Sequence, residues 1–207
     1  MARQLILENK GISAAEWFIP PFRIHEGELV VLNLKNPIYG PAVQDFFVDI
    51  ITGKATHPAV AVHHPLTYVS PFRQSWFRRR FNPMSVATYL EKNVDPASEY
   101  AGKIYEHRDM CGANYRIRPH TKVHTLLGGP RKLLALCATL GRHRYIAYDI
   151  RAVGPESVYI IHDMVKKHVS GGGTALLIEY YDELRNDCSR YVEAEWDLEG
   201  ITPASPQ

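Results

Sequence analysis

The strongest constraint on the fold comes from the segment 131–178, in which helical and strand patterns alternate. In chain order the sequence predicts a helix, a strand, a helix, a glycine turn and a strand, at residues 131–140, 145–148, 155–167, 171–173 and 174–178. A helix that joins two neighbouring strands in this way lets them pair in parallel, with the helix packed on one face of the sheet. This segment therefore predicts an α/β fold with a mostly parallel sheet.

The remainder of the chain carries shorter signals. Apolar runs predict strands at 5–7, 29–34 and 191–196, and helices at 45–51, 85–91 and 182–188. Three prolines predict that the segment 58–84 is irregular and mostly helical, because proline interrupts regular elements. We expect one domain over residues 1–200, with a small helical subdomain at about 70–125, and a flexible tail at 201–207.

Composition narrows the class of protein. With 207 residues, 45% of them apolar, the chain can bury a core without disulfides or a structural metal. The 24 basic and 22 acidic residues leave a net charge of +2, which gives no overall attraction to nucleic acid or acidic lipid. No apolar run approaches the roughly 18 residues that span a bilayer, and the first eight residues are too polar for a secretory signal. Three widely spaced cysteines without a CxxC pair indicate free thiols in a cytoplasmic protein.

Several features follow one another in an order that is known from one protein family. Gly27-Glu28 leads into an apolar strand, Leu127-Gly128-Gly129-Pro130 precedes a helix, Asp149 ends a strand, and Tyr180 follows the next strand. In order and spacing the chain resembles the nucleotide-binding subunit of an ABC transporter, over most of its length and most closely from 126 to 191. The resemblance implies a P-loop-NTPase fold, with a central, mostly parallel sheet flanked by helices and a small helical subdomain.

The phosphate-binding loop of that family is changed in this chain. The family loop, GxxxxGK[ST], wraps phosphates in backbone amides and adds a lysine. Residues 33–45 contain no Gly-Lys-Ser/Thr, and Gln44-Asp45 stands at about that place. Two prolines remove amide donors, Tyr39 adds bulk, and Asp45 brings negative charge towards a polyanion. We expect a packed connecting loop here instead of a phosphate cradle.

The other chemical positions of the family are changed as well. The resemblance places Pro71 at the position of the metal-contacting Gln, and Leu127 and Pro130 at the Ser and Gln of the LSGGQ signature. It places Ile150 at the catalytic Glu and Tyr180 at the switch His. The loop 151–156 lacks the Asp that contacts the opposite subunit. An alkyl side chain cannot act as a general base, so hydrolysis lacks its catalyst. We therefore expect no catalytic residue, no cofactor and no bound metal.

Four residues are left as a remnant of a nucleotide site, namely Gly128, Gly129, Asp149 and Tyr180. The glycine amides resemble those that approach an anion held by a partner subunit, and Asp149 resembles the carboxylate that holds magnesium through water. Each also has a structural interpretation, because a glycine pair fits a tight entry into a helix and an aspartate at a strand end often caps a turn. Tyr180 can donate a hydrogen bond but cannot titrate near neutral pH as histidine does.

One segment favours a protein partner. Residues 73–81 interleave arginines with aromatic rings, and five of them are candidate partner contacts: Trp76, Phe77, Arg78, Arg79 and Arg80. The resemblance places this segment in the subdomain that docks a transmembrane subunit. The same pairing of cations with rings is used to bind single-stranded nucleic acid, and that alternative would add Lys35 and Tyr39 as contacts.

These observations lead to one functional hypothesis and two alternatives. We expect an inactive ABC-ATPase-like subunit that has a structural or regulatory role in a protein assembly, such as an ABC-transporter-like complex. We expect it to be cytoplasmic and to reach the membrane only through another protein of that assembly. The first alternative is the non-catalytic half of an asymmetric ATPase heterodimer, paired with an active homologue. The second is a module that binds nucleic acid or a small ligand. The sequence is also compatible with a homodimer. His120 and His124 are four residues apart, a spacing that would place two imidazoles on one helical face, so a metal site is a minor alternative.

Overall fold

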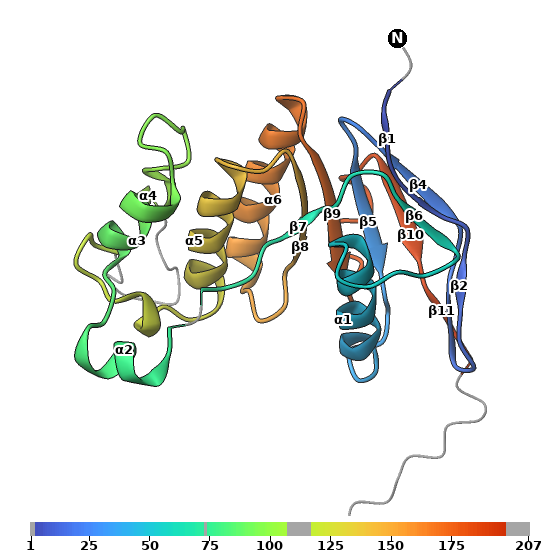
Figure 1. Ribbon diagram of the computed structural model, residues 1–207, viewed down its shortest axis with the longest axis horizontal. Coiled ribbons are helices and arrows are strands. Elements are labelled where there is room, and N and C mark those ends of the chain that lie inside the picture. The colour runs from blue at the N-terminus through green and yellow to red at the C-terminus, as the bar shows by residue number, and fades with distance from the viewer. Residues whose placement is uncertain (1–2, 73, 107–116, 198–207) are drawn as a thin grey trace, which may run out of the picture.

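The computed structural model describes residues 3–72, 74–106 and 117–197 (Figure 1). The strands are β1 (Leu5–Asn9), β2 (Ile12–Ser13), β3 (Trp17–Ile19), β4 (Phe22–His25), β5 (Leu29–Asn33), β6 (Val60–Val62), β7 (Thr67–Tyr68), β8 (Tyr145–Asp149), β9 (Thr174–Glu179), β10 (Arg190–Glu193) and β11 (Glu195–Trp196). The helices are α1 (Gly40–Ile51), α2 (Trp76–Phe81), α3 (Val86–Asn93), α4 (Lys103–Glu106), α5 (Gly128–Leu140) and α6 (Pro155–Ser170), with a short 3-10 helix η1 (Val123–Thr125).

A five-stranded parallel sheet forms the centre of the molecule. Its strand order is β10-β5-β9-β8-β7, and every neighbouring pair in it is parallel. All residues of β5 and β9 are buried, as expected for strands that are covered on both faces. The α/β fold with a mostly parallel sheet is therefore confirmed, and so are the helix, strand, helix, turn and strand predicted between residues 131 and 178.

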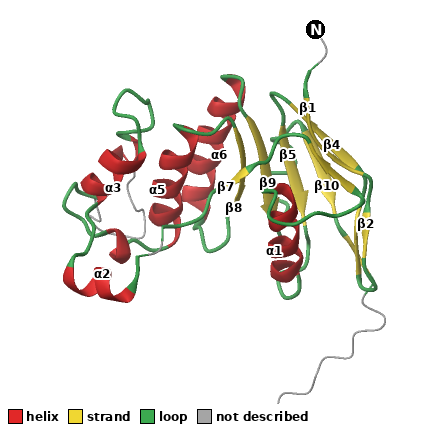
Figure 2. Cartoon of the chain, viewed as in Figure 1, coloured by secondary structure: helices red, strands yellow, loops and turns green. Residues whose placement is uncertain are grey.

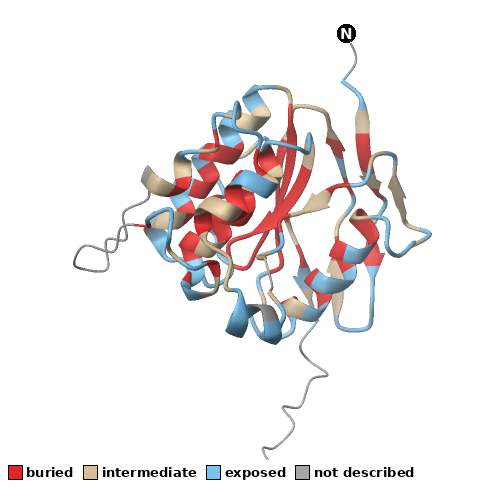
Figure 3. Ribbon diagram, turned by 60° about the vertical axis from the view of Figure 1, so that its left-hand side comes forward, coloured by how far each residue is buried: buried red, intermediate tan, exposed pale blue. Residues whose placement is uncertain are grey.

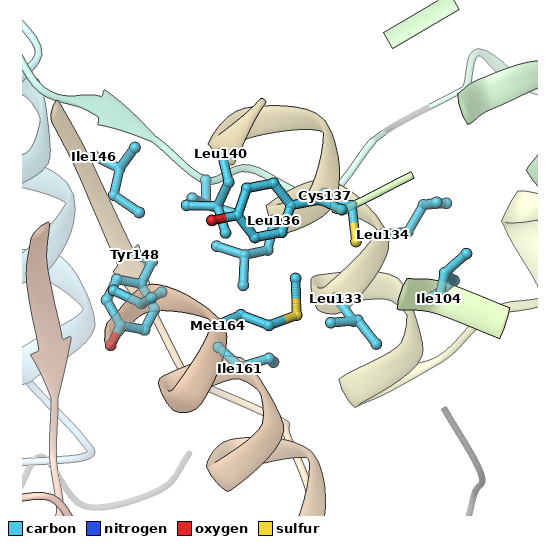
Figure 4. Packing of buried hydrophobic residues seen from close by; sticks show 14 of the residues in the cluster. Ile104, Leu133, Leu134, Leu136, Cys137, Leu140, Ile146, Tyr148, Ile161 and Met164 are labelled. Carbon is cyan, nitrogen blue, oxygen red and sulfur yellow. The ribbon is translucent and has the colours of Figure 1, made fainter. Parts of the chain in front are cut away.

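Two layers cover the central sheet (Figure 2). On one face, α5 and α6 pack against the inward side chains of β8 and β9, and Figure 4 shows Leu136, Tyr148, Ile161 and Met164 meeting in this core. On the other face, α1 and the antiparallel sheet β4-β1-β6 enclose a second core around Phe47. The buried strands between these layers stand out in Figure 3.

The helices α2, α3 and α4 lie beyond α5, on the side of the molecule opposite to the antiparallel strands (Figure 1). Ser85 caps α3 by accepting a hydrogen bond from the backbone amide of Thr88 at 3.2 Å, which explains the correctly predicted start of this helix. This part of the chain is the one for which the sequence predicts a helical subdomain.

Three local predictions are wrong. The helix predicted at 45–51 begins at Gly40, because Pro41 fits the first turn of a helix, where no intrahelical partner for its nitrogen is needed. The segment 58–84 contains the strands β6 and β7, which pair with distant strands β1 and β8. Residues 182–188 form turns instead of a helix, because Asp182 is tied to the sheet edge by hydrogen bonds from Asn33 at 2.8 Å and Tyr191 at 2.9 Å.

The strand predicted at 191–196 is split at Ala194. The first part, β10, pairs with β5, whereas β11 pairs with β3 in a small third sheet of order β11-β3-β2. Cys137 and Cys188 are free thiols, as predicted, while Cys111 and the predicted tail 201–207 lie outside the described residues. Within the described ranges, no helix is long and apolar enough to cross a membrane.

Candidate functional site

Polar side chains gather where the parallel strands end. β5 ends at Asn33, β8 at Asp149 and β9 at Glu179, and all three side chains are buried. The carboxyl ends of parallel strands form the edge at which α/β proteins bind their ligands. This edge is therefore the candidate functional site.

Asp149 is the centre of the site. Its Oδ1 accepts hydrogen bonds from Nζ of Lys132 at 3.0 Å and from the backbone N–H of Arg151 at 2.9 Å, and its Oδ2 accepts one from the Tyr68 hydroxyl. Burial alone would raise the pKa of Asp149, but the Lys132 ammonium and these hydrogen bonds outweigh it, so the pKa is lowered. The carboxylate is thus ionised, buried and already neutralised from within the chain.

Gln44 on α1 connects the ends of three strands. The Tyr180 hydroxyl donates a hydrogen bond to Oε1 of Gln44 at 2.6 Å, and Nε2 of Gln44 donates to the Tyr68 hydroxyl at 2.8 Å. The same nitrogen lies 3.4 Å from Oδ2 of Asp149. Burial raises the pKa of Tyr180 to about 12 and also raises the pKa of Tyr68, so both hydroxyls keep their protons. A chain of donors therefore leads from Tyr180 to the carboxylate.

The first turn of α1 contains Gly40 and Pro41. This turn is where a phosphate-binding helix carries its Gly-Lys-Ser/Thr residues. Placing Gln44-Asp45 there is therefore wrong, because Gln44 lies about one turn further along the helix and Asp45 is exposed. A Cβ added to Gly40 would overlap the ring of Tyr180. The Tyr180 ring thus occupies the space beside the first turn, and Pro41 has no N–H to offer an anion.

The loop before α1, residues 34–39, is held by contacts within the chain. Nε1 of Trp196 donates a hydrogen bond to the carbonyl of Leu34 at 2.6 Å, and the Lys35 ammonium lies 2.5 Å from a carboxylate oxygen of Glu193. Oδ1 of Asn36 accepts hydrogen bonds from two backbone amides of the same loop. Amides that would face a phosphate in a phosphate-binding loop are used here to hold the loop itself.

Lys132 is the buried cation of the site, although it belongs to none of the motifs described above. It is 5% exposed and lies in the second turn of α5. A signal was present in the sequence, because a lysine among the apolar residues of a buried helix needs a buried partner. Gln44 and Tyr68 gave no comparable signal.

Glu179 is the second buried carboxyl group at this edge. It is 1% exposed, and neither of its carboxyl oxygens has a hydrogen-bond partner among the described residues. Burial, followed by the charges of Asp182 and Glu183, raises the pKa of Glu179 to about 8. Glu179 therefore holds its proton at neutral pH.

A cavity of about 350 Å³ opens beside the network. Its walls come from the loop before α1, the segment after β8 and the segment after β9, and they include Pro37, Ile150, Arg151 and Tyr180. The described part of the chain contains no group of three or more side chains arranged to hold a metal ion. His124 lies in η1 and His120 precedes it, so the two imidazoles do not share one helix.

Comparison with solved structures identifies the architecture. The chain is similar to the ATP-binding subunit of an ABC transporter, with a TM-score of 0.60 and 12% identity over 91% of this chain and 85% of that chain. It is similar to a nucleotide-free ATP-binding cassette from an ABC transporter, with a TM-score of 0.60 and 15% identity over 92% and 87% of the two chains. It is also similar to an RNase-L inhibitor, with a TM-score of 0.59 and 17% identity over 94% of this chain and 40% of that one.

The fold is that of an ABC ATPase. No protein-family model and no curated protein matches the sequence. In this ABC ATPase fold, Asp149 and Tyr180 lie close together at the carboxyl edge of the sheet, joined through Gln44.

Gly128 and Gly129 belong to the first turn of α5 and do not join that network. Gly128 has φ +51°, and a Cβ added to it would lie 2.7 Å from the carbonyl oxygen of Ala152. A Cβ at Gly129 would overlap the side chain of Ser157. Close packing of α5 against the segment after β8 and the start of α6 therefore requires both glycines.

The predicted partner contacts lie in α2, and none of them belongs to the Asp149 network. Trp76 and Phe77 are 75% and 65% exposed, and Phe81, which sequence analysis did not select, is 67% exposed. The rings of Phe77 and Phe81 lie 4.7 Å apart. Arg79 and Arg80 are exposed on the same helix, whereas the side chain of Arg78 lies outside what the structure describes.

Proposed function

We propose that this chain is a non-catalytic ABC-ATPase-like subunit that acts as a structural or regulatory partner in a larger protein assembly. One observation carries the proposal: the carboxylate of Asp149 is satisfied by Lys132, Tyr68 and the Arg151 amide. The resemblance implies that this carboxylate holds magnesium through water in active members. Here the Lys132 ammonium, 3.0 Å away, supplies the positive charge in place of a metal ion.

The phosphate side of the site supports the same conclusion. An anion that approached the first turn of α1 would meet Pro41 and the ring of Tyr180 instead of free amides and a lysine. The nearby cation Arg151 lies 3.7 Å from Asp149 and is engaged with it. Both neighbouring cations are therefore engaged with Asp149 before any ligand arrives.

The residue that the resemblance places at the catalytic Glu cannot act as a base. The residue after Asp149 is Ile150, which is apolar and buried. The buried carboxyl group of Glu179, at the end of the neighbouring strand, keeps its proton at neutral pH because its pKa is raised to about 8. Neither side chain can take a proton from water at that pH.

The test is a comparison of hydrolysis with folding stability. We expect purified protein to hydrolyse Mg-ATP no faster than buffer, and to give no saturable heat with Mg-ATP in calorimetry. Asp149→Asn leaves the buried Lys132 without a charged partner, so we expect about 3–5 kcal/mol lower stability. The proposal is wrong if wild-type protein hydrolyses Mg-ATP and an Asp149→Asn protein that is still folded does not.

The exposed surface of α2 supports the partner role. We define the α2 surface as Trp76, Phe77, Arg79, Arg80 and Phe81. Three large apolar side chains exposed together with two arginines have the composition of an interface centre, in which aromatic residues and arginine are enriched. We propose that it contacts another subunit of an ABC-transporter-like complex, a membrane subunit being the partner that the fold suggests, so that this chain reaches the membrane through that subunit.

This partner role is tested by capture from the native cell followed by identification of the associated chains. We expect a Trp76→Ala/Phe77→Ala variant to lose a membrane subunit that the wild-type chain retains. The matched control is Tyr159→Ala, which removes an exposed ring, 56% accessible, from α6. Equal loss in the two variants, or retention in both, would count against the α2 surface.

A further inference from the structure

A smaller cavity, of about 230 Å³, lies apart from the Asp149 network. It is enclosed by the segment after β7, by α2, by η1 and by the first turn of α5, with the lining residues Phe72, Gln74, Arg79, Val123, His124 and Arg131. Three of these six can carry positive charge, and none is acidic. The lining includes neither glycine of the α5 entry and no member of the Asp149 network.

Two buried nitrogen atoms of this lining have no hydrogen-bond partner among the described residues. They are Nδ1 of His124 and Nε of Arg131. Nη2 of Arg131 donates a hydrogen bond to the carbonyl of Phe72 at 2.8 Å, which holds the guanidinium group against the segment after β7. A buried polar atom without a partner costs about 1–3 kcal/mol, and a bound water or ion is one of the arrangements that satisfy such an atom in native proteins.

Arg79 adds a second guanidinium group to the same cavity. Its side chain is exposed on α2, and it forms no ion pair with any residue of the described ranges. A guanidinium group presents its N–H donors in a planar fork that matches two oxygens of a carboxylate or phosphate. Arg79 and Arg131 thus offer such donors from two different elements, α2 and α5.

We propose that this cavity binds an oxyanion, the phosphate or carboxylate group of a ligand, between Arg79, His124 and Arg131. The cavity is smaller than the roughly 300–1,000 Å³ of pockets that enclose drug-sized molecules, so it suits one anionic group better than a whole nucleotide. The oxyanion accepts hydrogen bonds from the guanidinium group of Arg131 and from a ring N–H of His124, and the guanidinium group of Arg79 adds a third contact from solvent. The site is independent of whether the Asp149 site is catalytic.

The experiment titrates the full chain with sodium phosphate, and separately with sodium acetate, at an ionic strength held constant with sodium chloride. Calorimetry gives the affinity, and thermal unfolding gives a second measure, because a ligand that binds only the folded state raises Tm. We expect saturable binding of at least one of the two anions, and the stronger one identifies the ligand group as phosphate or carboxylate.

Two neighbouring arginines of α2 provide a matched pair of variants. Arg79→Gln removes a charge-assisted hydrogen bond and is expected to weaken binding at least about tenfold. Arg80→Gln removes the same charge from a residue that does not line the cavity, and is expected to leave the affinity unchanged. His124→Asn, which keeps a polar group of similar size at the cavity wall, is also expected to weaken binding.

The proposal is overturned by any of three results. The first is the absence of saturable binding for both anions. The second is an equal loss of affinity in Arg79→Gln and Arg80→Gln, since that would mean only a general attraction to positive charge. The third is an unchanged affinity in both Arg79→Gln and His124→Asn.

Discussion

Replacing Glu179 by glutamine should make the protein more stable at alkaline pH. Burial raises the pKa of Glu179 from an ordinary 4.5 to about 8 in the folded chain, while the unfolded chain keeps the ordinary value. Between these two values the folded protein holds a proton that the unfolded chain has released. Stability must therefore decrease as pH rises through this window, by about 1.4 kcal/mol per pH unit and by about 5 kcal/mol in all.

Glu179→Gln removes the ionisation but keeps the size of the protonated side chain. The free energy of unfolding of each protein is taken relative to its own value at pH 4.5. On this scale the variant should be more stable than the wild type by about 3 kcal/mol at pH 7 and by about 5 kcal/mol above pH 8. The assay is urea unfolding followed by circular dichroism from pH 4.5 to 9. Using the difference between wild type and variant cancels every other titrating group that the two proteins share.

The control is Glu16→Gln, which removes an exposed carboxylate. Its stability should follow the wild-type pH dependence. The reasoning is refuted if Glu179→Gln also follows the wild-type dependence between pH 4.5 and 8, because the Glu179 carboxyl group would then ionise in the folded protein as easily as in the unfolded chain.

Three further experiments test the site and its neighbours by chemical denaturation. Lys132→Met leaves the Asp149 carboxylate buried without its cation and should lower the free energy of unfolding by about 3–5 kcal/mol. The double variant Lys132→Met/Asp149→Asn should recover most of this loss. Additive losses of stability in the two single variants and the double variant would contradict the pairing. Gly129→Ala should lower the free energy of unfolding by more than about 1 kcal/mol, because the added methyl group overlaps Ser157. A second change, Ser157→Gly, should relieve this overlap. Unchanged stability of the Gly129→Ala protein would exclude the close contact. Ser85→Ala should cost about 1 kcal/mol by removing the cap of α3, and no loss would mean that the cap contributes nothing.

The parts of the fold that could be predicted from sequence depend on residues close together in the chain. The central strands β8 and β9 and the helices α5 and α6 are long apolar or amphipathic runs, and their order fixes parallel pairing. The strands β6 and β7 are two or three residues long and only half-buried, and pairing with distant β1 and β8 defines them. No local pattern reports such a pairing.

The candidate site was predictable to a similar extent. Asp149 and Tyr180 could be found because Asp149 ends one recognisable strand and Tyr180 follows the next. Gln44 could not be placed correctly, because the hydrogen bonds that define its role join it to residues far away in the chain, Asp149 and Tyr180. The function of Lys132 likewise depends on where α5 is packed, which the order of residues alone does not state.

The ion pair between Lys132 and Asp149 also bears on how this protein could be regulated. In an ATPase of this fold, arrival and departure of a metal-bound nucleotide change the local charge, and that change can be coupled to motion. In the proposed non-catalytic subunit the positive charge is covalently part of the polypeptide and never leaves. The conformation of this subunit would then not depend on the cellular ATP concentration. Any nucleotide-driven conformational change in the assembly would have to begin in the neighbouring subunits.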